Sequence, residues 1–310
     1  MILNFDVKDS EAGMRLSCVL KTKLHISNRL LIKLKNGKCI FVNNIICNVD
    51  YKLKRNDKIL IKLNNIETSS FNYPLYDFKL DILFEDDYLI IVNKPAFIPV
   101  HPCTNNSNKT LLNAIYNYYE KQNYKNCKAH IITRLDSNTS GICVIAKNSY
   151  IQDLFVSLKK ILNLTKTYTA LVNNIIANDH DYIINNIARN EHSIITRKVT
   201  NDINLGKYAK TEYTVLNRNI DLNYTKVSVI LHTGRTHQIR VHFASIGHTL
   251  LGDELYANIY DKDYSNICKT YINRHALHSS SISFMHPITH KTVKISCNEP
   301  LDFNLIKNSN

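Results

Sequence analysis

The spacing of apolar residues along the chain predicts an α+β protein in which strands outnumber helices. Apolar positions recur with helical spacing over residues 15–24, 27–34, 111–119 and 151–162. Short apolar runs typical of strands follow one another without a helix between each pair, so we expect a mixed, mainly antiparallel sheet with flanking helices, not a doubly wound one. These runs lie at residues 39–43, 58–63, 80–84, 88–93, 142–146, 166–172, 208–216, 224–231, 275–284 and 291–297.

The same pattern divides the chain into four parts. Residues 1–65 predict a small basic α/β module, with two helices followed by short strands. Residues 66–79 lack periodicity and contain a proline, which indicates a linker. A large domain is expected over residues 80–303, followed by a tail at 304–310. The basic module resembles a small RNA-binding domain shared by a ribosomal protein and many RNA-modifying enzymes, and a structural cap with solvated lysines is the alternative.

Several local signals add detail to these elements. In the module, the run 58–63 can pair with 39–43, and Asn36-Gly37 is expected to end the second helix because both residues tolerate positive φ. The runs 80–84 and 88–93 predict a hairpin that ends at Lys94-Pro95. Thr110 is a candidate N-cap for the helix that follows it.

Composition and charge narrow the classes of partner. The 310 residues are 44% hydrophobic and carry 39 Lys+Arg against 26 Asp+Glu, a formal net charge of +13. This excess favours a polyanionic partner, either nucleic acid or an anionic membrane surface. No secretion signal and no membrane-spanning apolar run is evident, so a cytoplasmic location is expected. The eight cysteines never form a C-x-x-C pair, and free thiols are therefore expected rather than a zinc ribbon.

One polar segment is a candidate for chemistry. It runs from His130 through Arg134-Leu135-Asp136 to Thr139-Ser140-Gly141, where a tight turn leads into an apolar strand. An aspartate beside such a turn can face a cleft. Taken alone, however, this pattern is more typical of a surface ion pair next to an ordinary turn.

A second segment favours a catalytic aspartate over a surface ion pair. Two arginines, four histidines and three of the seven glycines fall between His232 and Asp253. Thr233 or Thr236 can cap a helix that runs to about Ile246, with Arg235, Ile239 and His242 on one face. A buried arginine there would need a carboxylate partner, and a catalytic aspartate would need a cation that keeps it ionised.

Together the segments resemble the successive signatures of the RluA-type pseudouridine synthases. The resemblance covers about residues 80 to 303, and the motifs follow one another in the family's order, which is far more specific than any one motif. They are Asn93-Lys94-Pro95, Val100-His101-Pro102, Arg134-Leu135-Asp136 with Thr139-Ser140-Gly141, Lys166-Thr167-Tyr168 through Val172, Thr233-Gly234-Arg235-Thr236-His237-Gln238-Ile239-Arg240-Val241-His242, Arg274 to His278 and Phe284 to Pro287.

The resemblance implies an isomerase that breaks the glycosidic bond of a uridine in structured RNA, turns the base and rejoins it through carbon 5. No cofactor is required, because nothing is oxidised and no group is added. The family's catalytic aspartate corresponds to Asp136, as nucleophile or as base. Tyr168 corresponds to the tyrosine that stacks on the target base, and Arg235 to the arginine that pairs with the aspartate.

Other residues are expected to bind the RNA. Arg134 resembles the residue that fills the space left by the extruded uridine, with a phosphate contact as the alternative. Lys94 and Arg240 are expected to bind phosphates. The sequence also departs from the family: Thr133 stands where a His is usual, Phe97 where a Gly is common and Thr249 where a Pro is common. These departures affect the loops that would hold the RNA, and so the choice of target.

Two other functions are compatible with parts of the sequence. An RNA-binding protein that has lost catalysis would lack one of Asp136, Tyr168 and Arg235, whereas all three are present. A metal-dependent hydrolase built on the histidine cluster would need a metal-ligand spacing, and neither H-E-x-x-H nor another zinc spacing occurs. The resemblance implies a monomer whose partner is structured ribosomal RNA or tRNA. We expect no membrane and no metal as partners.

Overall fold

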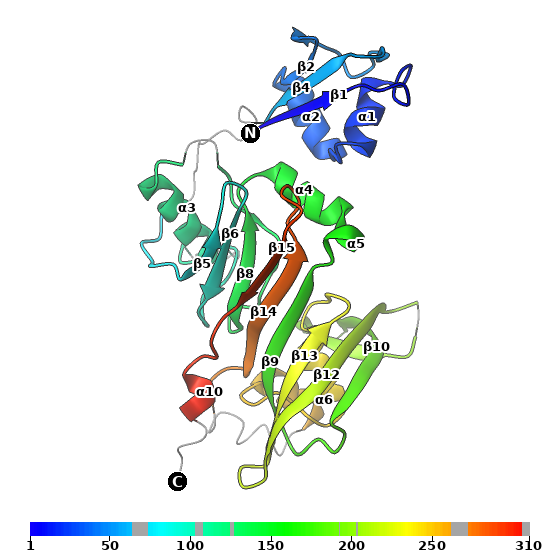
Figure 1. Ribbon diagram of the computed structural model, residues 1–310. Coiled ribbons are helices and arrows are strands. Elements are labelled where there is room, and N and C mark those ends of the chain that lie inside the picture. Colours follow the sequence, from blue (N-terminus) through cyan, green and yellow to red (C-terminus); the bar gives the residue numbers. More distant parts are fainter. Residues whose placement is uncertain are drawn as a thin grey trace.

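A computed structural model describes residues 1–63, 74–102, 108–124, 127–191, 193–202, 204–261 and 272–305. The described chain forms a small sheet with two helices and a much larger sheet with several helices (Figure 1). No helix in these ranges combines the length and the apolar character needed to cross a bilayer. The expected linker at 66–79 and the tail at 304–310 lie partly outside the described residues, so the domain boundaries stay predictions.

The small sheet and its helices occupy the N-terminal end of the molecule (Figure 1). Four antiparallel strands lie in the order β1 (Ile2–Asp6), β4 (Lys58–Lys62), β2 (Ile40–Val42) and β3 (Ile45–Ile46). The helices are α1 (Leu16–Thr22) and α2 (Asn28–Asn36). The expected pairing of residues 58–63 with 39–43 is confirmed, whereas strand β1 had not been predicted.

The end of α2 differs from expectation in one respect. Gly37 follows the helix as its C-cap, but its φ is −77° and therefore ordinary. The positive φ falls on the next residue, Lys38, at 52°. The Asn-Gly signal located the helix end correctly and misplaced the left-handed residue by one position.

The large sheet is mixed and mainly antiparallel, as expected. Among the described strands only β8 and β14 run parallel, and they do so over just two residue pairs. Two further strands lie off the main path, β15 (Thr292–Ser296) beside β14 and β7 (His130–Ile131) beside β8. The main order is β11 (Ser193–Thr200), β10 (His180–Asn190), β12 (Lys207–Asn219), β13 (Tyr224–Leu231), β9 (Thr165–Asn173), β14 (Leu277–Met285), β8 (Ser140–Ala146), β6 (Leu89–Lys94) and β5 (Ile82–Glu85).

Strands β6 and β8 are apolar on both faces because a helix covers each face. Alternate residues such as Ile90 and Val92 pack with α3 (Leu111–Lys121), and the others, such as Ile91, pack with α4 (Ser149–Ser157). Thr110 accepts a hydrogen bond from Asn113 N, which confirms the expected N-cap. The single helix expected over residues 151–162 is instead broken after Leu158, and α5 (Lys159–Leu162) follows.

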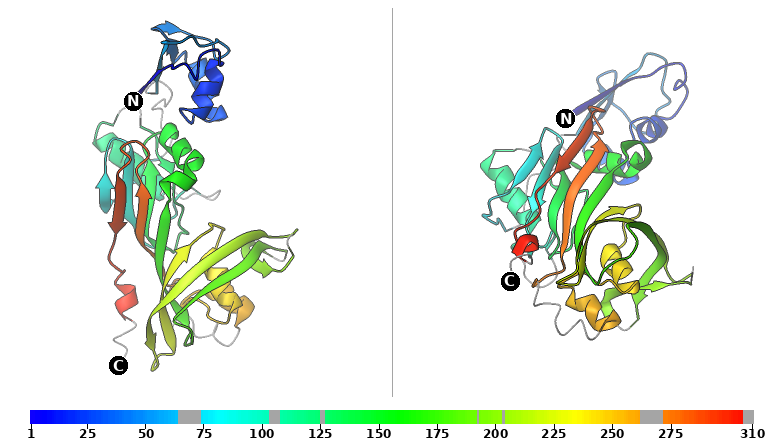
Figure 2. Two further views of the ribbon diagram at one scale, coloured as in Figure 1. Left: turned by 45° about the vertical axis from the view of Figure 1, so that its right-hand side comes forward. Right: turned by 60° about the horizontal axis from the view of Figure 1, so that its bottom comes forward.

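The far part of the sheet contains the elements that the apolar pattern did not predict. Strands β10 and β11, together with helix α7 (Glu254–Tyr260), lie close to α6 (Gln238–Ser245), and the strands curve around it (Figure 2). Much of β10 is exposed, so its sequence lacks the continuous apolar run of a central strand. A short helix, α10 (Asp302–Leu305), ends the described chain.

A close backbone approach fixes the start of β8. Gly141 adopts φ +107°, a conformation that L side chains rarely adopt, and a Cβ there would lie 2.3 Å from Ser279 O. The parallel contact between β8 and β14 occurs at this point. The glycine therefore lets the chain that precedes β8 lie directly against β14, where it forms one wall of a cavity.

Candidate active site

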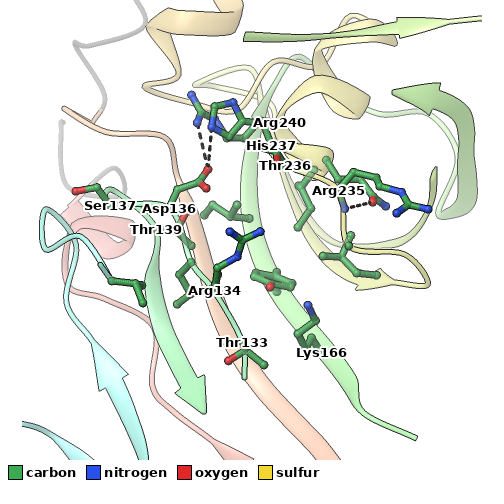
Figure 3. A pocket seen from close by; sticks show the side chains of 18 of the residues that line it. Thr133, Arg134, Asp136, Ser137, Thr139, Lys166, Arg235, Thr236, His237 and Arg240 are labelled. Atoms are coloured by element: carbon green, nitrogen blue, oxygen red, sulfur yellow. Dashed lines mark hydrogen bonds and ion pairs between the residues drawn. The ribbon is translucent and has the colours of Figure 1, made fainter. Parts of the chain in front are cut away.

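A cavity of about 470 Å³ opens between three parts of the chain: the loop that precedes β8, strand β9 and the turn that precedes α6 (Figure 3). The loop contributes Arg134 and Asp136, the strand contributes Lys166 and Tyr168, and the turn contributes Arg235 among others. Residues from three predicted motifs therefore share one cavity.

Asp136 lies at one side of this cavity and has two cationic or polar neighbours (Figure 3). Its Oδ2 lies 3.2 Å from Arg240 Nη1 and 3.6 Å from His237 Nε2. About a third of the Asp136 side chain is exposed, since its relative accessibility is 34%. The carboxylate is thus held by a cation on one side and remains open to a ligand on the other.

Contacts with two other residues hold the side chain of Arg240 in position beside Asp136. Its Nε and Nη2 donate to the two oxygens of Asp253 over 2.7 and 2.8 Å, a bidentate pair, and its guanidinium lies 5.1 Å from the ring centroid of Tyr256. Burial alone would lower the pKa of Arg240, but the hydrogen bonds and charge of Asp253, with a further contribution from Asp136, raise it overall. Arg240 is therefore a permanent cation in a set orientation.

This geometry corrects two sequence-based expectations. Arg235 was expected to pair with Asp136, but it is exposed, its Nε donates to Tyr208 O over 3.0 Å, and it lies across the cavity from the carboxylate (Figure 3). Arg240 was expected to bind phosphates, but it is 6% exposed and fully engaged. The cation beside Asp136 is Arg240.

The reason lies in where α6 begins. The helix starts at Gln238, after His237 in the left-handed region at φ 57°, and not at Thr233 or Thr236. The Gln238 side chain accepts hydrogen bonds from Arg235 N and Thr233 Oγ1, which closes the preceding turn. Arg235 consequently belongs to the turn, and Arg240 occupies the buried helical position.

Lys94 also differs from expectation. Its side chain is 0% exposed, and its ammonium donates to the carbonyl oxygens of Pro95, Ile98 and Ser137 over 2.8 to 2.9 Å. Burial lowers the pKa of Lys94 to about 8, so the ammonium form still predominates at neutral pH. Lys94 does not contact RNA phosphates in this arrangement; it ties the loop of Asp136 to the segment after β6.

Tyr168 lines the cavity from β9, as expected, and is 4% exposed. Burial, and then the nearby charge of Asp136, raise the pKa of its phenol above the usual value. The ring forms part of the cavity wall, and the hydroxyl is a weaker acid than in water.

Arg134 also lines the cavity and is exposed. No side chain or carbonyl among the described residues pairs with its guanidinium, which leaves it available to a ligand.

Buried histidines support the turn that carries Asp136. His275 Nε2 lies 2.7 Å from Thr139 Oγ1, and His278 Nδ1 lies 2.9 Å from Ser140 Oγ. Burial lowers the pKa of His275 well below its usual value and that of His278 to about 4, so both are neutral near pH 7. Within the part of the chain that the structure describes, no three His, Cys, Asp or Glu side chains gather as metal ligands. These histidines contribute hydrogen bonds and packing.

Comparison with known proteins identifies the family of the chain. Residues 88–245 match the model of the RNA pseudouridylate synthase family. The chain belongs to this family. It is 33% identical over 296 residues to the RNA pseudouridine synthase YhcT of Bacillus subtilis (strain 168), covering 96% of this chain and 93% of the relative. It is 35% identical over 305 residues to the ribosomal large subunit pseudouridine synthase D of Buchnera aphidicola subsp. Schizaphis graminum (strain Sg), covering 94% and 92%.

A solved structure shares the fold of this pseudouridine synthase. Human RNA pseudouridylate synthase domain containing 1 superposes with a TM-score of 0.58 at 23% identity and covers 72% of this chain and 84% of its own. The family match and the relatives described above confirm the RluA-type resemblance, and the chain is an isomerase acting as an RNA pseudouridine synthase. The pseudouridine synthase fold, with a small antiparallel module at the N-terminus, is confirmed as well.

Proposed function

We propose that this enzyme isomerises particular uridines in structured ribosomal RNA, tRNA or both, with Asp136 as the catalytic residue. The observation that carries the proposal is that, among the described residues, Asp136 is the only carboxylate lining the large cavity. The reaction needs a carboxylate near carbon 1 of the ribose, and Asp136 is partly exposed on the cavity side.

The product is an isomer of the uridine. The bond between N1 and carbon 1 breaks, the detached base turns, and carbon 5 bonds to carbon 1. Carbon 5 then loses its proton, and N1 takes up a proton in exchange. Asp136 acts either as a nucleophile at the sugar or as a base toward a sugar proton. Arg240 serves both routes, because it orients the carboxylate of Asp136 and places a positive charge beside it when the RNA excludes water from the cavity.

Tyr168 is proposed to stack on the target base. Its ring lies in the cavity wall, and burial raises the pKa of its hydroxyl, which would make the phenol a poor base near neutral pH. We therefore propose that Tyr168 holds the base during its rotation and does not remove the proton from carbon 5.

Two exposed arginines flank the cavity and suit contacts with RNA. Arg134 is two residues from Asp136 and is proposed to occupy the space left by the flipped uridine, with a phosphate contact as the alternative. Arg235, at the opposite side, is proposed to contact the RNA backbone.

Ribosomal RNA is the substrate that the relatives suggest first, since several of them carry the name ribosomal large subunit pseudouridine synthase D. We propose that this enzyme acts as a monomer in the cytoplasm, where that RNA is found. Mapping pseudouridines in total RNA from cells with and without the gene identifies the positions.

The catalytic assignment is tested by Asp136→Asn. The variant keeps the shape of the side chain and loses its charge, so we expect conversion of uridine to become undetectable while RNA binding persists. Tritium release from RNA labelled at carbon 5 of its uridines measures the reaction, and Asp87→Asn, at an exposed aspartate between β5 and β6, is the matched control. Near-normal conversion by Asp136→Asn would refute the assignment.

The same assay separates the two alternative functions. A protein that only binds RNA would show no conversion in the wild type. A metal-dependent hydrolase would lose its activity in a chelator, whereas the synthase proposed here is expected to be indifferent to it.

A further inference from the structure

A second cavity, of about 340 Å³, adjoins the one that contains Asp136. It lies between β9, the end of β13 and the helices α4 and α5. The two cavities share several lining residues, so they form one continuous groove. The shared residues are Ile132, Lys166, Leu231, Gly234 and Arg235.

The charged side chains that line this second cavity are all basic. They are Lys159, Lys166 and Arg235, and no carboxylate lines it within the described ranges. Lys166 is half-buried, yet neither its ammonium nor that of Lys159 forms a hydrogen bond or an ion pair with any described residue. A half-buried cation without a partner is unfavourable, and it indicates a site that an external anion completes.

The two lysines also act on each other. Burial, and then the charge of Lys159, lower the pKa of Lys166. The protein thus brings two like charges toward one cavity, an arrangement that costs stability unless an anion binds between them.

The rest of the cavity is mainly apolar. Phe155, Leu162 and Leu164 line it, and Val156, which is 75% exposed, extends this surface outward. A combination of apolar wall and clustered cations suits a nucleotide, whose base or sugar packs on the wall while its phosphate meets the cations.

The position of Lys166 relates this cavity to the catalytic one. Lys166 and Tyr168 are two residues apart on β9, so their side chains lie on the same face, about 6.6 Å apart along the strand. That separation corresponds to about one nucleotide step of an extended RNA strand. A nucleotide beside Lys166 would be a neighbour of one beside Tyr168.

We propose that this second cavity binds the nucleotide adjoining the target uridine, with its phosphate held by Lys166 and Lys159 and its base or sugar against Phe155, Leu162 and Leu164. The proposal rests on the proposed function of the cavity that contains Asp136. Lys166 and Lys159 are positioning residues, which set the register of the RNA and do not touch the reacting atoms.

Lys159→Gln, Lys166→Gln and the double variant test the subsite. The probe is a hairpin transcript containing a uridine that the wild type converts, and binding is followed by fluorescence anisotropy at several NaCl concentrations. Each single substitution should reduce the slope of log K against log salt, and the double variant should reduce it by about 1 in all, because both lysines hold the same phosphate. The single-turnover rate of Lys159→Gln at saturating RNA should stay within about twofold of wild type, because Lys159 does not line the cavity that contains Asp136.

Lys160→Gln is the matched control, because Lys160 is the exposed neighbour of Lys159 and does not line the cavity. It should leave the slope unchanged, and Lys166→Arg, which keeps the charge, should retain it. If Lys160→Gln lowers the slope as much as Lys159→Gln, the charge acts without a defined subsite and the proposal is wrong. The thermal unfolding temperature of the Gln variants should not be lower than that of the wild type, because the repulsion between Lys159 and Lys166 has been removed.

A chemical change in the RNA gives a second measurement. A neutral methylphosphonate replaces each phosphate near the target uridine in turn. At one position it should weaken wild-type binding severalfold and weaken the double variant far less, because the partner lysines are already gone. If the loss of affinity from the methylphosphonate and the loss from the double variant simply add at every position, the proposed subsite is wrong. If Asp136→Asn still converted uridine, the proposed function would fail instead, so the two failures are distinguishable.

Discussion

At the scale of single residues, Arg240 determines how the carboxylate of Asp136 is held in the candidate site. It joins the buried Asp253 to the partly exposed Asp136, and the bidentate pair with Asp253 leaves Nη1 for the second carboxylate. A lysine could not form this arrangement, because it lacks the planar set of donors that spans both carboxylates.

Replacement of Arg240 should therefore be severe, and replacement of Arg235 mild. Arg240→Ala leaves Asp253 buried without a partner and Asp136 without a cation, so we expect kcat to fall by about 100-fold or more and the free energy of unfolding to drop by about 3 kcal/mol. Arg235→Ala should raise KM and leave kcat within about tenfold, because its side chain faces away from Asp136.

Steady-state kinetics and urea unfolding of the two variants check this contrast. Arg240→Lys separates folding from catalysis, because it keeps a positive charge and should recover part of the stability while turnover remains low. Equal kinetic losses in Arg235→Ala and Arg240→Ala would contradict the arrangement described for the site.

How far the sequence could specify the site is clear from these same residues. The ordered motifs located Asp136 and Tyr168, and both line the cavity. Choosing between Arg235 and Arg240 required the first residue of α6, which depends on the left-handed His237 and on the side chain of Gln238, and neither leaves a periodic signal. The backbone conformation of Phe97 also leaves no periodic signal. Phe97 adopts φ 68°, at a position where a Gly is common in the family.

At the scale of elements, helix α6 combines Arg240 with a buried histidine on the side of β12. His242 is 0% exposed, its Nδ1 lies 2.9 Å from Thr211 Oγ1, and its Nε2 has no hydrogen-bond partner among the residues that the structure describes. Burial lowers the pKa of His242 to about 4. The packing of α6 on β12 therefore depends on a neutral imidazole.

This burial predicts a loss of stability in acid. The unfolded chain binds a proton at His242 below about pH 6.5, while the folded protein resists it until about pH 4. The stabilisation is complete above the unfolded pKa and decreases as pH falls through this window, by up to about 1.4 kcal/mol per pH unit. Urea unfolding of wild type and His242→Gln between pH 7 and pH 4 measures it, and the variant should show the shallower slope. Parallel slopes would contradict the assignment.

Predicting elements from the apolar pattern succeeded where strands are covered on both sides. The runs at β6, β8 and β9 correspond to buried strands. It failed at β10, where Ile183 and Ile187 are buried among exposed neighbours, and at helix α7, which is only seven residues long. Such elements form because they pack against α6, a contact that no local pattern records.

At the scale of the whole molecule, the excess of basic residues is spread over both sheets. In the N-terminal module, α2 exposes Arg29 and Lys35, with Lys33 half-buried, while Leu30, Leu31 and Leu34 face the core. A helix that presents several basic side chains suits contact with RNA phosphates as well as solvation.

A triple variant of helix α2 decides between the RNA-binding module and the structural cap. With Arg29, Lys33 and Lys35 each replaced by Gln, we expect weaker binding of structured RNA and a slope of log K against log salt reduced by about 2 to 3, because up to three phosphate contacts are lost. The rate of conversion at saturating RNA should remain unchanged. Wild-type affinity and slope would identify the module as a structural cap.

The buried Lys94 has a consequence for how the enzyme depends on its surroundings. Three carbonyl oxygens around one positive charge form the kind of shell that a bound sodium or potassium ion would occupy, and here the charge is attached to the chain itself. A tethered cation cannot be chelated, diluted or exchanged for another. The loop that carries Asp136 should therefore keep its shape whatever the ionic composition of the medium. Changes in salt should alter the affinity of the protein for RNA and leave the reacting groups in place.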